Sequence, residues 1–126
     1  MASLILDSGA LIAIDRGDRR IGAVLLEAGR AGIDAFTSST CVAEVWRNPA
    51  RQARLTRALT GTIEVPLDSQ AARRCGELLA IAKTSDIADA AVALLAKAGD
   101  VILTSDAGDI EHLVRARGIY ARVQHI

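Results

Sequence analysis

The stretch TSDIADAAVALLAKAGDVILTSD, residues 84–106, contains the signals of a helix, a turn and a buried strand in direct succession. Apolar residues recur at helical spacing through residues 87–98, and Gly99 ends that pattern. Residues 101–103 then form a short apolar run, typical of a strand that is buried on both faces. Acidic residues border these elements, at Asp86, Asp89 and Asp106.

The same alternation of strand and helix signals extends over the rest of the chain. Further strands are predicted at residues 4–6, 35–37, 62–65 and 119–126. Helices are predicted between them, including one from Pro49 to Leu59. This order favours an α/β fold with a mainly parallel central sheet flanked by helices. We expect one domain over residues 1–126, because the chain is too short to form two cores.

The composition fits that fold and limits the classes of function. Hydrophobic residues make up 51% of the 126 residues but aromatic residues only 2%, so aliphatic side chains must form the interior. Lys and Arg together number 15, as do Asp and Glu, so any contact with nucleic acid requires a local basic patch. Cys41 and Cys75 lack metal-ligand spacing, and we interpret both as small buried residues.

No segment has the features of a signal peptide or a membrane span. The first residues, MASLILDSGA, contain no basic region, and their apolar run ends at Asp7. The longest apolar run, AAVALLA, is far short of the roughly 20 residues that cross a bilayer. We therefore expect a cytoplasmic protein that does not associate with membranes.

Asp7 and Asp106 each follow a predicted strand, and ligand sites of parallel sheets lie beyond the carboxyl ends of the strands. Asp7 also fits the role of N-cap for the next helix, and both interpretations stay open. Glu44 lies in TCVAEVWR among apolar neighbours. If its carboxylate is buried there, it requires a partner or a bound cation.

Two pairs of acids have the spacing of one helical turn. Asp86 and Asp89 share a helix face, with Asp86 suited to the N-cap and Asp89 set deeper, before AAVALLA. Asp89 is therefore the stronger candidate for function, and Asp86 is an additional one. Asp106 and Asp109 repeat the spacing, and we interpret Asp109 as the residue that caps the last helix.

Carboxylates that converge repel one another, and a divalent cation removes that repulsion. Oxygen ligands without His or Cys favour Mg²⁺ or Mn²⁺, ions that assist phosphodiester cleavage. His112 and His125 lie outside the acidic motifs, and the chain contains no glycine-rich phosphate loop. The acids therefore favour a metal-dependent reaction at a phosphodiester.

Four motifs in this order resemble the PIN-domain family, and within it the VapC-like toxin ribonucleases. They are LILDSGALIA, CVAEVWR, SDIADAAVALLA and VILTSDAGDI, and together they span almost the whole chain. The resemblance implies a PIN-like three-layer fold, metal-dependent RNA cleavage, homodimerisation and inhibition by a small antitoxin protein. By motif position it implies that the metal-site and catalytic residues are Asp7, Glu44, Asp89 and Asp106.

Two positions depart from the family pattern. Family members often carry two polar residues after the first Asp, whereas here Ser8 is followed by Gly9. An aromatic residue often follows the last Asp of the fourth motif, and here Ile110 takes that place. Neither departure removes a metal ligand. The alternative is a catalytically silent PIN-like module that binds RNA or protein, and metal-dependent RNA cleavage distinguishes the two.

Arginines supply the basic patch that RNA binding would need. In WRNPARQARLTR they recur at spacings expected for one broad helical flank, at Arg47, Arg51, Arg54 and Arg57. A solvated helix face is the alternative interpretation. Arg16, Arg19 and Arg20 lie in a second basic segment and would extend a phosphate-contacting edge.

Overall fold

The structure is a computed structural model that describes residues 2–126. Its centre is a five-stranded sheet in which every neighbouring pair of strands is parallel, in the order β3-β2-β1-β4-β5. The strands are β1 (Leu4–Leu6), β2 (Ala35–Ser38), β3 (Ile63–Val65), β4 (Val101–Thr104) and β5 (Arg122–His125). The middle strand, β1, pairs with β2 on one side and β4 on the other.

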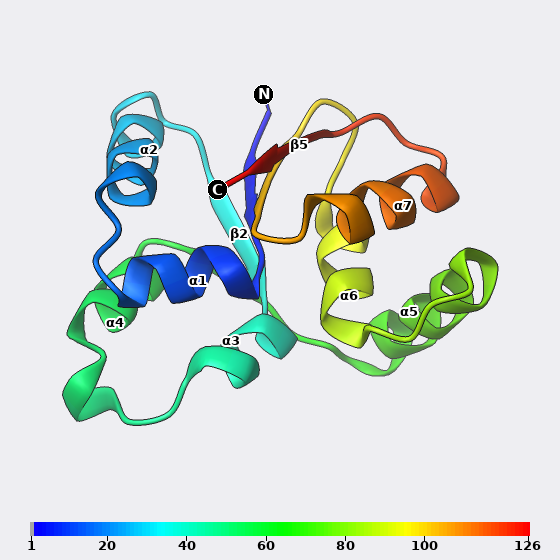
Figure 1. The fold of residues 1–126 in the computed structure, drawn as a ribbon, viewed down its shortest axis with the longest axis horizontal. Helices are drawn as coiled ribbons and strands as arrows, with labels where there is room; N and C mark the ends of the chain where they lie inside the picture. Colours follow the sequence, from blue (N-terminus) through cyan, green and yellow to red (C-terminus); the bar gives the residue numbers. More distant parts are fainter. Residues whose placement is uncertain (1) are drawn as a thin grey trace.

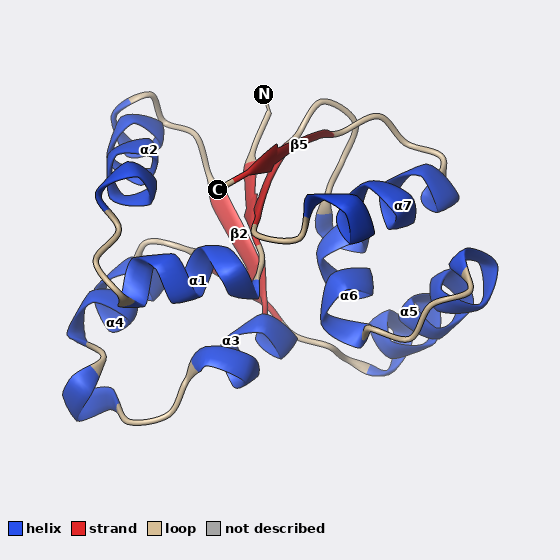
Figure 2. Cartoon of the chain, in the orientation of Figure 1, coloured by secondary structure: helices blue, strands red, loops and turns tan. Residues whose placement is uncertain are grey.

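Helices cover both faces of this sheet (Figures 1 and 2). One face carries α1 (Ser8–Asp15), α2 (Arg19–Arg30) and α4 (Ala53–Thr60). The other face carries α5 (Ser69–Ala82), α6 (Ile87–Leu95) and α7 (Ala107–Arg117). The short helix α3 (Ser39–Val45) contacts both α1 and α6. The predicted three-layer α/β fold is confirmed, and it is the fold expected of a PIN-like domain.

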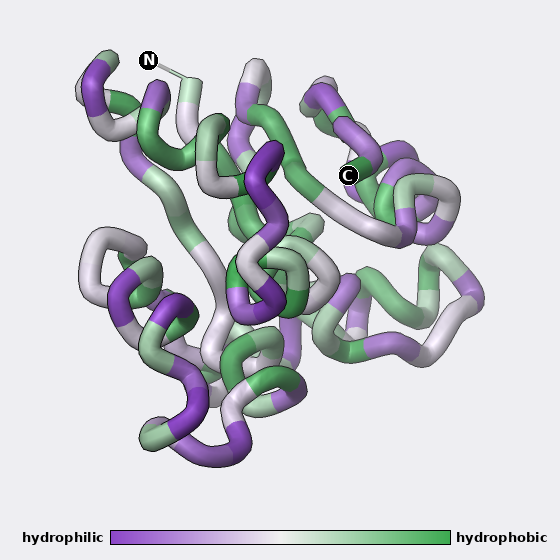
Figure 3. Tube along the Cα trace, turned by 60° about the vertical axis from the view of Figure 1, so that its left-hand side comes forward, coloured by the Kyte–Doolittle hydropathy of each residue, from purple (hydrophilic) through white to green (hydrophobic). Residues whose placement is uncertain are grey.

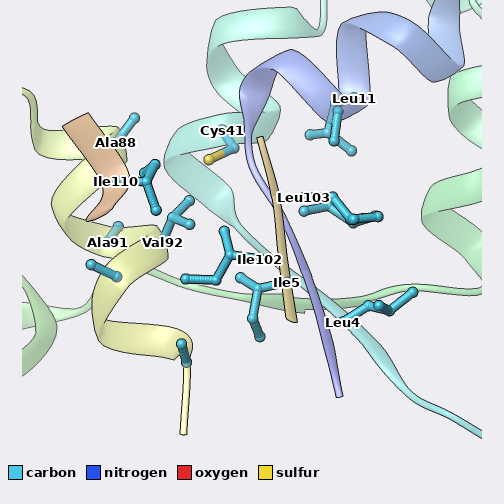
Figure 4. Close-up of a cluster of buried hydrophobic side chains, with 14 of the residues drawn as sticks. Leu4, Ile5, Leu11, Cys41, Ala88, Ala91, Val92, Ile102, Leu103 and Ile110 are labelled. Atoms are coloured by element: carbon cyan, nitrogen blue, oxygen red, sulfur yellow. The ribbon is translucent and has the colours of Figure 1, made fainter. Parts of the chain in front are cut away.

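The core is built from aliphatic side chains on both faces of β1 and β4. Figure 4 shows Leu4 and Leu103 on the side of α1, and Ile5 and Ile102 on the side of α6. The register explains this arrangement, because Ile5 is paired with Ile102 across the sheet. Each of these side chains is nearly fully buried, and each contributes roughly 1.5–3 kcal/mol to folding.

Helix α6 lies inside the molecule, and its small residues allow close packing. Five of its residues are buried: Ala88, Ala90, Ala91, Val92 and Ala93. The helix packs against α5, α7, β1 and β2, so it has little solvent-facing surface. In Figure 3 hydrophilic residues instead mark the outer turns of the peripheral helices. Among the described residues, no helix combines the length and apolarity needed to span a bilayer.

Two sequence predictions about the elements were wrong. The helix expected from Pro49 to Leu59 is interrupted. A short 3-10 helix, η1 (Pro49–Arg51), is followed by Gln52, and α4 begins one residue later. The buried Gln52 side chain accepts from the backbone N–H of Arg47 and donates to the Val45 carbonyl, which holds the chain in this bend. The last strand is also shorter than expected, because only Arg122–His125 pairs with β4.

The interruption separates the arginines that were expected on one helical flank. Arg47 precedes η1, and its guanidinium donates to the carbonyls of Ala43 and Trp46. Arg51 ends η1, and only Arg54 and Arg57 belong to α4. The prediction of one continuous flank is therefore wrong.

Asp100 joins the start of the chain to β4, and its loss should destabilise the fold. Its side chain is buried, and its two carboxylate oxygens accept from Ser3 N and Lys97 N, each at 2.8 Å. Asp100→Ala leaves both donors without a partner, so we expect the free energy of unfolding to fall by about 2–3 kcal/mol in urea titrations. The control is Asp68→Ala, which removes an exposed helix cap and should lower it by only about 1 kcal/mol.

Candidate metal centre

The acids of the first and fourth motifs meet at the carboxyl ends of β1 and β4. These strands are neighbours, with Leu6 paired with Leu103, so the residues that follow them emerge side by side. The backbone N–H of Asp7 donates to the Leu103 carbonyl at 3.3 Å. The position expected for Asp7 and Asp106, at one edge of a parallel sheet, is thus observed.

Asp7 is both a helix cap and a member of the acidic site. Its Oδ1 accepts from Ala10 N at 2.8 Å and caps α1. Only 3% of the residue is exposed, and burial raises the pKa of its carboxyl group, while hydrogen bonds from Thr104 and from backbone N–H groups oppose that rise. The N-cap interpretation is therefore confirmed, and the functional role of Asp7 stays a prediction.

Asp86 begins helix α6 as predicted, and the functional role of Asp89 stays a prediction. Asp86 is the N-cap of α6, and its Oδ1 accepts from the N–H of Asp89 at 2.9 Å. Asp89 lies within the first turn, and the pKa of its carboxyl group is raised to about 7. Burial is the largest cause of this rise, and the negative charges of Asp86, Asp106, Asp7 and Asp109 also contribute to it. Asp89 is thus the acid that most needs a cation.

Asp109 belongs to the site, whereas the sequence suggested that it caps the last helix. That interpretation was wrong: Asp106 occupies the N-cap position of α7, and its side chain makes no capping bond. Asp109 lies one turn further, and carboxylate oxygens of Asp89, Asp106 and Asp109 all lie within 4.8 Å of one another. The pKa of Asp106 is raised by burial, then by the hydrogen bond and the charge of Asp109.

Glu44 reaches the same region from α3, through a hydrogen bond with Ser8 that the sequence did not indicate. Its side chain is exposed rather than buried, because the buried face of α3 is formed by Cys41 and Val45. The hydroxyl of Ser8 donates to Glu44 Oε1 at 2.5 Å. Ser8 follows Asp7 directly, so this hydrogen bond positions Glu44 beside the first acid, outside the group of three oxygens.

Cys41 lies beneath Ser8, Asp7 and Glu44 and is fully buried. Burial is the largest cause that raises the pKa of its thiol to about 11, and the charges of Asp7 and Glu44 add to it. A thiol that stays protonated is a poor ligand for a hard cation. The prediction that Cys41 and Cys75 are small buried residues is confirmed.

The acidic group has no basic partner in residues 2–126, where the one ion pair joins Arg30 to Glu27. His112 is also held elsewhere, with its Nε2 at 2.6 Å from the Ala82 carbonyl. A donor set limited to carboxylates with raised pKa values fits a hard divalent cation such as Mg²⁺ or Mn²⁺. The structure therefore brings together Asp7, Asp89, Asp106 and Asp109, with Glu44 at their border.

Neither a family model nor a curated protein matches this chain.

Proposed function

We propose that the chain is a Mg²⁺- or Mn²⁺-dependent endoribonuclease of the PIN-domain type. The observation that carries the proposal is the convergence of acids from remote segments at the carboxyl edge of a parallel sheet. Within residues 2–126 none of them forms an ion pair with a Lys or Arg, and the pKa of Asp89 is raised to about 7. An arrangement of this kind is stabilised when a cation binds.

Asp89, Asp106 and Asp109 would hold the cation, with Asp7 beside them. When bound, it supplies charge neutralisation at a phosphodiester and lowers the pKa of a coordinated water. The chain's own residues orient these carboxylates. The backbone of α1 fixes Asp7, Asp86 fixes the first turn around Asp89, and Ser8 holds Glu44 at 2.5 Å. Because Asp89 binds a proton near neutral pH, cation binding should release that proton.

The biological role that we propose is that of a VapC-like toxin in a type II toxin-antitoxin system. The support is the order of the four acidic motifs together with the PIN-like fold that carries them. In this role the protein acts in the cytoplasm as a homodimer, cleaves RNA, and is inhibited by a small antitoxin protein.

We expect the purified protein to cleave single-stranded RNA in Mn²⁺ or Mg²⁺ and to be inactive in EDTA. Cation binding to the folded chain alone should also raise the melting temperature, because a ligand at 100 times its Kd stabilises by about 2.7 kcal/mol. Both effects should be weaker at pH 5 than at pH 8, since Asp89 must lose its proton. Gel assays and differential scanning fluorimetry measure them.

A silent binding module predicts a different pair of results. It would bind RNA without cleaving it in any cation, and thermal stability would not depend on Mn²⁺. Cleavage that persists in EDTA would contradict the metal-dependent mechanism.

A further inference from the structure

A cavity of about 520 Å³ lies beside the acidic site, on the side of the sheet that carries α1 and α2. Its walls come from both helices, from the loop after β4 and from the end of β5. The volume lies within the range of small-molecule sites, roughly 300–1,000 Å³. The acids of the metal centre do not line it, so it is a separate compartment.

The cavity and the acidic site share one wall. Gly9 and Ser105 both line the cavity. Gly9 follows Asp7 and Ser8, and Ser105 directly precedes Asp106. A polymeric ligand bound at the acids therefore needs to cross only the wall formed by Gly9 and Ser105 to enter the cavity.

The rim of the cavity is basic. Arg16, Arg20 and His125 line it, with Asp18 as its acid. The Asp18 carboxylate is used locally, since its Oδ1 accepts from the backbone N–H groups of Arg20 and Ile21. The one ion pair in residues 2–126 lies elsewhere, so the two arginines are available to an anion.

The interior is apolar with a few polar groups. Ile12, Ala13, Ile21 and Val24 supply aliphatic surface, against which a flat heterocycle packs well. Gln124 and Ser105 supply donors and acceptors. Apolar walls, an amide, a hydroxyl and a basic rim match the base, ribose and phosphate of a nucleotide.

We propose that this cavity binds one nucleotide of the RNA strand, next to the phosphodiester that lies at the acids. The inference rests on the proposed ribonuclease function and assigns a substrate-binding role to Arg16, Arg20 and the aliphatic cavity. The aliphatic side chains contact the base of this nucleotide, and the guanidinium groups of Arg16 and Arg20 bind its phosphate. The cavity thus selects for single-stranded RNA, because a paired base cannot enter it.

The test measures RNA binding without cleavage. A fluorescein-labelled single-stranded RNA is titrated in EDTA, and anisotropy gives the Kd at several salt concentrations. Arg16→Ala/Arg20→Ala should weaken binding by about tenfold or more. The slope of log K against log salt should fall by about 0.7, the value for one neutralised phosphate on a single strand. Arg73→Ala, an exposed arginine on α5, is the matched control and should bind like wild type.

A second variant separates the cavity from a simple basic surface. Ala13→Phe fills the interior without changing charge, and it should weaken RNA binding while the salt slope stays as in wild type. Unchanged binding by either variant would overturn the proposal. So would light scattering that shows either variant turning a dimer into a monomer, because the cavity would then be an interface between copies.

Failure of this inference is distinguishable from failure of the ribonuclease proposal. If wild type cleaves RNA and the double arginine variant binds and cleaves equally well, only the nucleotide site is wrong. If wild type never cleaves but loses RNA affinity through these substitutions, the nucleotide site remains and the nuclease assignment falls.

Discussion

Asp89→Asn should remove most RNA cleavage, by about a hundredfold or more, and leave the fold intact. Asp89 is the half-buried acid whose pKa is raised to about 7, first by burial and then by the neighbouring acids. An amide of the same shape keeps the packing of α6 but removes the charge that a divalent cation needs. RNA cleavage across a Mn²⁺ titration measures the loss.

The same substitution should stabilise the metal-free protein at alkaline pH. The folded-state pKa of Asp89 lies above the ordinary value of 3.8, so the folded state binds the proton more tightly than the unfolded state. Wild-type stability therefore falls as the pH rises from about 4 to about 7. We expect the free energy of unfolding of Asp89→Asn to exceed that of wild type by about 1–2 kcal/mol at pH 8 and to match it below pH 4. The difference at pH 8 is smaller than the full pKa shift would give, because water screens this half-buried group.

Asp86→Asn is the matched control for this experiment. Asparagine also caps helices, so it can keep the acceptor for the N–H of Asp89, and stability should change little. Asp86→Ala removes the acceptor and should lower the free energy of unfolding by about 1 kcal/mol. An active Asp89→Asn beside an inactive Asp86→Asn would reverse the roles of the two acids.

Gly9→Ala should impair both stability and cleavage. A Cβ at Gly9 would come within 2.6 Å of Ser105 Cβ and 3.1 Å of Ser105 N, so rotation of the serine hydroxyl cannot relieve the clash. The loop that carries Asp106 must move instead. We expect unfolding free energy to fall by about 1–3 kcal/mol and cleavage to fall at least tenfold, measured by urea titration and by gel assay.

The double variant Gly9→Ala/Ser105→Gly tests this cause. Removing the Ser105 side chain removes the two nearest atoms, Oγ and Cβ, and leaves the backbone nitrogen at 3.1 Å, so cleavage should partly recover. Gly76→Ala is the control, because nothing lies within 4 Å of a Cβ there and the helix should gain up to about 1 kcal/mol. No recovery in the double variant would mean that Gly9 matters for another reason.

The fold and most of the acidic site could be predicted because their signals are local. The apolar run of residues 101–103 and the helix that precedes it belong to an alternation of strands and helices that favours a parallel sheet, and the structure has one. The roles of Asp106 and Asp109 could not be separated in the same way. Acids one turn apart are equally suited to a cap and to a ligand, and the packing of α7 against α6 decides between them.

The features that were missed depend on particular side-chain contacts, one between remote residues and one within a bend of the chain. Gly9 was recognised as a departure from the family pattern, but only the structure shows that Ser105 fills the space above it. Gln52 interrupts a predicted helix because its amide binds Arg47 N, Asn48 N and the Val45 carbonyl. Local propensity carries no information about such contacts, since they form only after the chain has folded back.

The pairing of β1 with β4 also determines when the acidic site can form during synthesis of the protein. Leu4 is paired with Val101, so Asp7 leaves the ribosome about a hundred residues before Asp106. At about 5–20 residues per second that interval lasts on the order of 5–20 s. A nascent chain that stops before β4 lacks one of the two neighbours of its central strand and also lacks Asp106 and Asp109, two of the acids near Asp89. Under the proposed function, we therefore expect incomplete translation products to be inert, because they lack part of the acidic site.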